Sequence, residues 1–123
     1  MSPRVGCDLV ALGRLERLLA DEDFTRRVFH PVELEDCEGR KDRLAALGGR
    51  FAAKEAMVKA LGTGLITGGV FPRDVWVRRD PEGRPRLEYA PHVSERLARL
   101  GCASGEVSIS HDGDYAMATV LLF

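Results

Sequence analysis

The sequence predicts an α+β fold, in which helices pack on a mostly antiparallel sheet. Segments with alternating or β-branched apolar residues lie near both ends of the chain, while helical spacing dominates between residues 12 and 61. Two turn sequences, Asp80–Gly83 and Asp112–Asp114, each join two strand-like segments. Strands joined by such short turns run antiparallel, and strand pairs that follow a run of helices are typical of α+β proteins.

The first third of the chain predicts a strand followed by helices. Val5–Val10 has the period-two pattern of a strand, and leucines at helical spacing predict a helix over Leu12–Leu19. A less regular helical stretch covers about Thr25–Leu34, where Pro31 must begin a new helix or break one. The charged segment Glu35–Arg43 is predicted to be a turn or connector.

The strongest helix prediction covers Ala45–Leu61, which is rich in the good helix formers Ala, Leu, Lys and Glu. Gly62 supplies a stop signal for this helix. Residues 62–69 hold four glycines in eight positions, so a loop is expected after the helix.

The second half of the chain predicts two strand pairs around one helix. Val75–Val77 and Arg86–Tyr89 form the first pair, Val93–Leu100 is a helix, and Val107–His111 and Tyr115–Leu122 form the second pair. The predicted order is therefore strand, three helices, two strands, helix, two strands. No repeat or linker interrupts this order, so we expect one domain over residues 1–123.

Composition and charge exclude several classes of protein. The 123 residues carry 18 Lys+Arg and 19 Asp+Glu, a net charge of -1, whereas a nucleic-acid binder is usually strongly basic. No apolar run approaches the roughly 20 residues of a membrane span, and the polar start does not resemble a signal peptide. The cysteines at positions 7, 37 and 102 fit neither a disulfide framework nor a zinc motif. We therefore expect a cytoplasmic protein that binds neither nucleic acid nor membranes.

Two carboxylates on different predicted elements are candidate metal ligands. Asp8 lies within a strand, where Asp is disfavoured, so it is either an exposed strand-end residue or a rigidly held ligand for a hard cation such as Mg²⁺. Glu55 and Lys59 share a helix face with apolar neighbours, as expected at a cleft or a subunit contact. The alternative for Glu55 and Lys59 is an ordinary i,i+4 ion pair on the surface.

Several cations and glycines could meet phosphate groups. Arg50 and Lys54 are a like-charge i,i+4 pair, which becomes favourable when a phosphate lies near both. His111 ends a strand immediately before a turn, and Gly62 and Gly64 could let backbone N–H groups approach a phosphate. A structural histidine and a plain helix stop are the commoner alternatives. Because the chain has no nucleophile-elbow pattern, this set favours metal-assisted phosphoryl transfer between bound substrates.

Three ordered motifs resemble those of the holo-acyl-carrier-protein synthases, the small 4′-phosphopantetheinyl transferases. Gly6–Val10 (GCDLV) resembles their N-terminal G-x-D motif. Arg50–Gly64 (RFAAKEAMVKALGTG) resembles F-x-x-K-E-A-x-x-K-A-x-G-T-G, which is the most specific of the three. Val107–His111 (VSISH), followed by Tyr115 and Ala116, is similar to their C-terminal motif. The resemblance implies the 4′-phosphopantetheinyl transferase fold.

The resemblance also implies a reaction and a cofactor. Coenzyme A would supply 4′-phosphopantetheine to a serine of an apo acyl carrier protein, releasing adenosine 3′,5′-bisphosphate. Such activation serves fatty acid synthesis, and a polyketide carrier is the alternative. Asp8 and Glu55 match the Mg²⁺ ligands of the family, and Lys59 matches a lysine beside the pyrophosphate that would stabilise or protonate the leaving group. The base that takes the serine proton could be Glu55, directly or through a water molecule.

The remaining matched positions concern the coenzyme, the carrier protein and other subunits. Positions that contact the coenzyme, lie beside it or shape the adjoining loop are matched by Arg50, Lys54, Gly62, Gly64 and His111. Arg14 and Arg17 resemble a basic surface that receives an acidic helix of the carrier protein, with simple solvation as the alternative. Family members usually form homotrimers with the active site between subunits, so we expect a homotrimer here.

Two other classes of function compete with an active transferase. A binding module that had kept the fold would bind the coenzyme or the carrier protein without transfer. A purely structural trimer would bind neither. The presence of Asp8, Glu55 and Lys59 together favours the enzyme.

Overall fold

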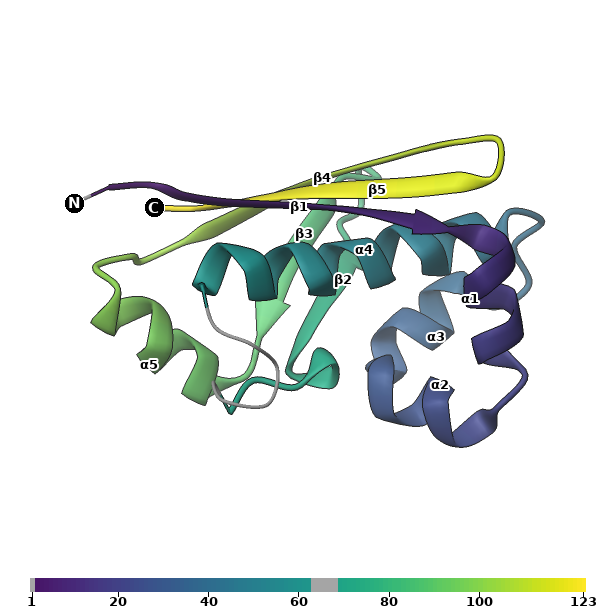
Figure 1. Ribbon diagram of the computed structural model, residues 1–123, viewed down its shortest axis with the longest axis horizontal. Helices are drawn as coiled ribbons and strands as arrows, with labels where there is room; N and C mark the ends of the chain where they lie inside the picture. The colour runs from purple at the N-terminus through teal and green to yellow at the C-terminus, as the bar shows by residue number, and fades with distance from the viewer. Residues whose placement is uncertain (1, 63–68) are drawn as a thin grey trace.

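The computed structural model describes residues 2–62 and 69–123, and Figure 1 shows its elements. Gly64 and most of the loop predicted for residues 62–69 lie outside the described residues. The elements are β1 (Arg4–Ala11), α1 (Leu12–Leu19), α2 (Glu22–Val28), α3 (Pro31–Cys37), α4 (Arg43–Leu61), the 3₁₀ turn η1 (Pro72–Asp74), β2 (Val75–Arg79), β3 (Pro85–Tyr89), α5 (Pro91–Arg99), β4 (Gly105–Asp112) and β5 (Tyr115–Leu122).

The structure has two helices where the sequence predicted one irregular helical stretch over Thr25–Leu34. Pro31 is the first residue of α3, a position where the missing N–H of proline has no partner to lose. α3 then continues into the segment Glu35–Arg43, so the prediction of a connector there is wrong for its first residues. Only residues 38–42 link α3 to α4.

The strands form two antiparallel sheets, where one was expected. In the first sheet β5 lies between β1 and β4, while β2 pairs with β3 in the second sheet. α4 packs beneath the three-stranded sheet and also contacts β2 (Figure 1), so the long helix joins the two sheets. The predicted α+β class with antiparallel pairing is confirmed.

α4 crosses the three-stranded sheet closely, and glycines permit the approach. A Cβ atom on Gly6 of β1 would lie 1.9 Å from the carbonyl oxygen of Ala56. A Cβ atom on Gly49 would lie 2.4 Å from Cγ2 of Ile109 in β4. The first half of α4 therefore lies beneath β4, and its second half lies beneath β1.

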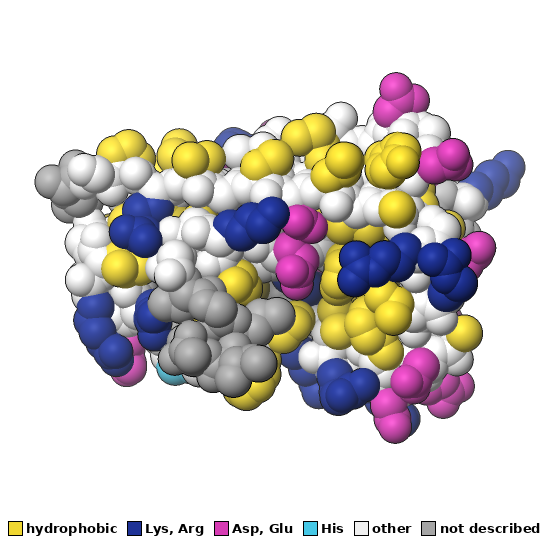
Figure 2. All heavy atoms as spheres, in the orientation of Figure 1, with side chains coloured by type: hydrophobic (Ala, Val, Ile, Leu, Met, Phe, Trp, Pro, Cys, Tyr) yellow, Lys and Arg dark blue, Asp and Glu magenta, His cyan; other side chains and the backbone are white. Residues whose placement is uncertain are grey.

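One face of the three-stranded sheet is buried and the other carries exposed apolar side chains. The predicted apolar stripe of α4 is buried as expected and comprises Ala53, Ala56, Met57 and Ala60. On the opposite face of the sheet, Val5 is 65% exposed and Leu9 is 62% exposed. Figure 2 shows hydrophobic side chains in a row along the upper edge, over this sheet. No helix in the described part of the chain is long and apolar enough to cross a membrane.

Candidate active site

Asp8, Glu55 and Lys59 come together where β1 crosses the second half of α4. Lys59 Nζ donates hydrogen bonds to Asp8 Oδ1 at 3.0 Å and to the carbonyl oxygen of Cys7, also at 3.0 Å. The ion pair of Lys59 is thus made with strand β1 rather than with Glu55 one turn before it. The alternative of an ordinary i,i+4 pair is therefore not what the structure contains.

Glu55 lies in surroundings that oppose its negative charge. Its half-buried position raises its pKa, and the nearby charge of Asp8 raises it further. Lys59 and Arg14 lower the pKa of Glu55, but by less. Arg14 on α1 therefore belongs to the surroundings of the same cluster. A cation between the two carboxylates would relieve their repulsion.

The two carboxylates fit a magnesium ion. Mg²⁺ is commonly held by one or two protein carboxylates, and substrate phosphates and water complete its coordination. Among residues 2–62 and 69–123 no group of three or more His, Cys, Asp and Glu side chains could enclose a metal ion. Asp8 and Glu55 are the carboxylates of this cluster that could hold such an ion together with a phosphate-bearing substrate.

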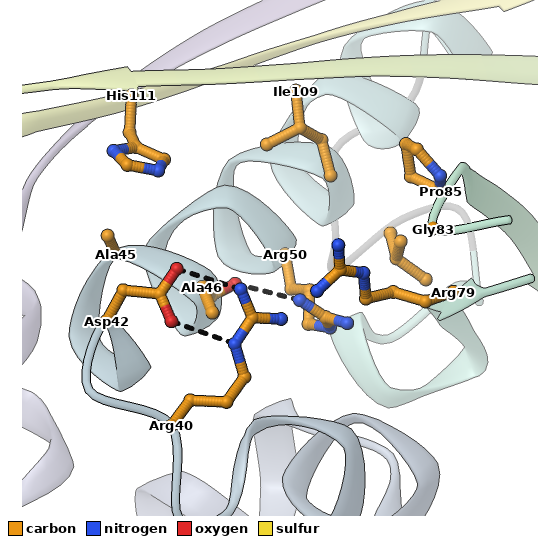
Figure 3. Close-up of a pocket in the computed structure, with 11 residues that line it drawn as sticks. Arg40, Asp42, Ala45, Ala46, Arg50, Arg79, Gly83, Pro85, Ile109 and His111 are labelled. Carbon is orange, nitrogen blue, oxygen red and sulfur yellow. Dashed lines mark hydrogen bonds and ion pairs between the residues drawn. The ribbon is translucent and has the colours of Figure 1, made fainter.

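A basic pocket lies between α4, β4 and the β2–β3 sheet. Its volume is about 150 Å³. Figure 3 shows Arg40, Arg50 and Arg79 entering it from three different segments, with His111 above them on β4. The lining residues are Arg40, Asp42, Ala45, Ala46, Arg50, Val77, Arg79, Gly83, Pro85, Ile109 and His111.

Arg50 is buried in the wall of this pocket with unused hydrogen-bond donors. It is 4% exposed, and its Nη1 donates to the carbonyl oxygen of Ala46 at 3.2 Å. Its Nε and Nη2 have no hydrogen-bond partner, and its ion pair with Asp36 is long, with 3.9 Å between Nη2 and Oδ2. Buried polar groups are normally satisfied, so these donors suit an anion that enters the pocket.

Lys54 does not line the pocket with Arg50, although both match positions that contact the coenzyme or lie beside it. It is 1% exposed, and its ammonium group forms an ion pair with the buried Glu33. Burial lowers the pKa of Lys54, and the charge of Glu33 opposes this effect. The ammonium group of Lys54 has protein partners and does not line this pocket, so its place beside the coenzyme stays a prediction.

The remaining predicted residues lie as follows. Gly62 ends α4 in the left-handed conformation with φ of 75°, which confirms the predicted helix stop. Arg14 and Arg17 are both exposed on α1. Sequence analysis missed Arg40 and Arg79, which lie in charged segments without a motif, so no local signal distinguishes them from solvated arginines.

The carboxylate cluster and the basic pocket lie on different sides of α4. Arg50 and Glu55 are five residues apart, which separates them by about 140° around the helix and ~7.5 Å along it. Across the sheet, Asp8 belongs to one edge strand and His111 to the other. Within one chain, therefore, α4 and the central strand separate the two groups.

The fold and this pair of charged sites define a known class of protein. A family model described as the 4′-phosphopantetheinyl transferase superfamily matches residues 4–120. The chain therefore belongs to the 4′-phosphopantetheinyl transferase superfamily. A holo-acyl-carrier-protein synthase of Trichlorobacter lovleyi is 42% identical to it, covering 96% of this chain and 94% of the relative. Within the superfamily, the chain is accordingly an enzyme of the holo-acyl-carrier-protein synthase type.

Solved structures agree with this assignment. A holo-acyl-carrier-protein synthase from Neisseria meningitidis has a TM-score of 0.87 and 34% identity, covering 98% of this chain and 97% of that chain. An ACPS–CoA complex from Chronobacterium ammoniagenes has a TM-score of 0.83 and 34% identity, covering 99% and 97%. The expected fold is thus confirmed over nearly the whole chain.

Proposed function

We propose that this enzyme transfers 4′-phosphopantetheine from coenzyme A to a serine of an apo acyl carrier protein, with release of adenosine 3′,5′-bisphosphate and a requirement for Mg²⁺. The observation that carries the proposal is the cluster of Asp8, Glu55 and Lys59 at the crossing of β1 and α4. The relatives named above, one of them a CoA complex, support the coenzyme and the carrier protein as the two substrates.

Asp8 and Glu55 would hold the metal ion, which when bound neutralises charge on the pyrophosphate of the coenzyme and polarises the phosphorus. Glu55 is also suited to accept the proton of the attacking serine, directly or through a water molecule, because its raised pKa brings it closer to that of an effective general base. The hydrogen bond with Asp8 raises the pKa of Lys59, so Lys59 stays protonated and can donate hydrogen bonds to the leaving phosphate.

The basic pocket would bind a second phosphate of the coenzyme, the 3′-phosphate of its ribose. Arg50 has free buried donors there, and Arg79 and His111 line the same space. A guanidinium group recognises phosphate through two parallel N–H donors, which Arg50 has available at Nε and Nη2. Lys54 follows Arg50 by one turn of α4 and would lie beside the coenzyme without lining the pocket.

A homotrimer with composite active sites would bring the two charged groups together. Since they lie on different sides of α4 within one chain, one coenzyme can contact both most simply where the pocket of one copy adjoins the carboxylates of the next. The exposed apolar face of the three-stranded sheet, with Val5 and Leu9, offers a surface for that assembly. We take residues 1–123 as the single folding domain of each copy.

The carrier protein would dock on α1. Arg14 lies close enough to influence Glu55, and the exposed Arg17 follows it by one turn, so an acidic helix placed there would bring its serine to the carboxylate cluster. A fatty acid carrier is the proposed substrate, and a polyketide carrier remains the alternative. Three unpaired cysteines agree with the reducing cytoplasm as the location.

The test is to incubate the enzyme with coenzyme A, Mg²⁺ and an apo acyl carrier protein, and to weigh the carrier by mass spectrometry. We expect a gain of one phosphopantetheine that disappears in EDTA and returns with added Mg²⁺. A mass gain that persists in EDTA would contradict the metal site. Coenzyme binding without any mass gain, over fatty acid and polyketide carriers, would favour the binding module instead.

A further inference from the structure

A buried ion pair that the proposed chemistry does not use joins α3 to α4. Glu33 is 0% exposed and Lys54 is 1% exposed, and their charged groups are in direct contact. Buried ion pairs often add little net stability over apolar packing, because both charges lose their hydration. Their contribution to geometry is a better-supported reason to look at them, since each charge needs partners in fixed positions.

Both members of the pair also hold the backbone around strand β2. Lys54 Nζ donates to the carbonyl oxygens of Pro72 at 3.1 Å and of Val75 at 2.6 Å. Glu33 Oε2 accepts a hydrogen bond from the N–H of Val77 at 3.0 Å, and Oε1 accepts one from the N–H of His30, also at 3.0 Å. Two backbone atoms of β2 and one of the preceding turn η1 are therefore hydrogen-bonded to α3 and α4.

These atoms lie beside the basic pocket. Val77 lines the pocket, and Arg79, two residues further along β2, lines it as well. Residues two apart in a strand point to the same side, so the register that Glu33 imposes at Val77 also determines where Arg79 points. On α4, Arg50 lies one turn before Lys54, and so the same pair sets the distance between the two arginines.

A second and longer ion pair between α3 and α4 lies one helical turn from Glu33 and Lys54. Asp36 follows Glu33 by three residues on α3 and faces Arg50 at 3.9 Å, and Asp36 Oδ2 has no hydrogen-bond partner. At the spacing of α3 and α4 at which Glu33 and Lys54 are in direct contact, Asp36 and Arg50 form a long ion pair without a hydrogen bond. Arg50 consequently keeps its donors free for a ligand.

We propose that Glu33 and Lys54 are positioning residues for the phosphate pocket: they set the spacing of α3, α4 and β2 at which Arg50 keeps Nε and Nη2 without hydrogen-bond partners and faces Arg79 across the pocket. This inference rests on the proposed function, in which the pocket binds the 3′-phosphate of coenzyme A. Neither residue touches the ligand, so both act through Arg50 and Arg79.

The test uses two variants that change the pair in different ways. Glu33→Asp keeps both charges but shortens one side chain by a methylene group, and Lys54→Met keeps the length but removes the charge. Arg78→Met is the matched control, because Arg78 lies on the same strand and pairs with Glu88 at a more exposed position away from the pocket lining. Each protein is checked by circular dichroism, and the KM is measured for coenzyme A and for 3′-dephospho-coenzyme A.

We expect the KM for coenzyme A to rise about tenfold in Glu33→Asp and Lys54→Met, as when one charge-assisted hydrogen bond is misaligned. The KM for 3′-dephospho-coenzyme A should change less than about twofold, since that substrate lacks the group the pocket holds. Binding of Mn²⁺ to the Asp8–Glu55 cluster, followed by electron paramagnetic resonance, should stay unchanged. Arg78→Met should match the wild type in every measurement.

Other outcomes overturn the inference. A folded Glu33→Asp with an unchanged ratio of the two KM values would show that the pair does not position the pocket. An unfolded Glu33→Asp would also overturn the inference, because it would show that the pair supports the whole fold rather than this site. The folding state of Lys54→Met would not change that conclusion. Failure of the proposed function itself is distinguished by Arg50→Ala: if that variant leaves the KM for coenzyme A unchanged, the pocket does not bind the phosphate at all.

Discussion

At the scale of single residues, the proposed site keeps charged groups in surroundings that only a ligand would satisfy. The carboxylate of Glu55 is half-buried beside a second negative charge, which raises its pKa. The guanidinium of Arg50 is buried with two nitrogen atoms lacking a hydrogen-bond partner. Each arrangement is unfavourable in the free protein, and each would be relieved by a group of opposite charge. Stability is thus reduced at the positions where the substrates are proposed to bind.

Glu55→Gln should therefore stabilise the metal-free protein while abolishing turnover. A carboxyl group whose pKa is higher in the folded state holds its proton more tightly there, so its contribution to stability falls as pH rises through and above its unfolded pKa. Glu55→Gln has no carboxyl group to ionise, so it does not lose this stability as the pH rises. Measured in EDTA, its increase in melting temperature over the wild type should be larger at pH 7.5 than at pH 4. Transfer to the carrier should fall by about 10²-fold or more, since a proposed metal ligand and base is lost.

Glu16→Gln serves as the control for this measurement, because Glu16 is exposed on α1 and should show no such pH-dependent gain. A Glu55→Gln protein that melts below the wild type at both pH values would contradict the electrostatic description of the site.

At the scale of elements, the position of Asp8 depends on how closely β1 approaches α4. Gly6 lies two residues before Asp8 on the same face of the strand, directly against the backbone of α4 at Ala56. This contact explains in physical terms why the motif combines a glycine with an aspartate. Without a side chain at position 6 the strand can lie on the helix, and the carboxylate two residues later then reaches Lys59.

Gly6→Ala should move β1 away from α4 and so disrupt the cluster. The added Cβ would lie 1.9 Å from the carbonyl oxygen of Ala56, and backbone atoms cannot move aside as a side chain can. We expect a loss of roughly 3 kcal/mol or more in the free energy of unfolding, measured by urea denaturation.

The matched control is Gly13→Ala in α1, where an added Cβ would have no atom within 4 Å. This variant should be as stable as the wild type or more stable by up to about 1 kcal/mol, because alanine is the better helix former. Equal stability of the two variants would show that the close approach at Gly6 is not required.

At the scale of the whole molecule, the arrangement of the charged groups favours an assembly. The carboxylates are at the β1 edge and the basic pocket is at the β4 edge, with α4 and β5 between them. The outward face of the same sheet carries apolar residues that a free monomer would leave in water. Both features would be explained if copies of the chain met at this sheet and shared their active sites.

Complementation between inactive variants tests the shared site. If Glu55 from one copy acts with Arg50 from the next, a mixture of Glu55→Gln and Arg50→Ala subunits regains some intact sites. With random mixing in equal amounts, about a quarter of the sites should have both residues. One copy at an interface keeps Glu55 in about half of the cases, and the adjoining copy independently keeps Arg50 in about half. Co-expressed variants should therefore recover about a quarter of wild-type transfer at limiting coenzyme, while the separately purified variants remain impaired. No recovery in confirmed mixed oligomers would contradict a composite site.

The local sequence determined most of the elements and singled out the members of the carboxylate cluster. Periodic leucines, Gly62 and the turn sequences depend on interactions within a few residues, so helix α1, the end of α4 and both hairpins were predictable. Asp8, Glu55 and Lys59 stood out because charged groups were placed among apolar neighbours. The split at Pro31 was expected only as one of two possibilities.

Only the tertiary structure decided which charges meet. Lys54 and Arg50 are equivalent in sequence, as cations one turn apart, yet one is paired with Glu33 in the interior and the other has free donors at a pocket. Lys59 meets Asp8 across 51 residues of sequence, and Arg79 reaches the pocket because β2 and β3 form a sheet of their own. Local patterns report hydrogen bonding and burial along one element, whereas the partner of a charged side chain depends on how distant elements pack, which no short pattern encodes.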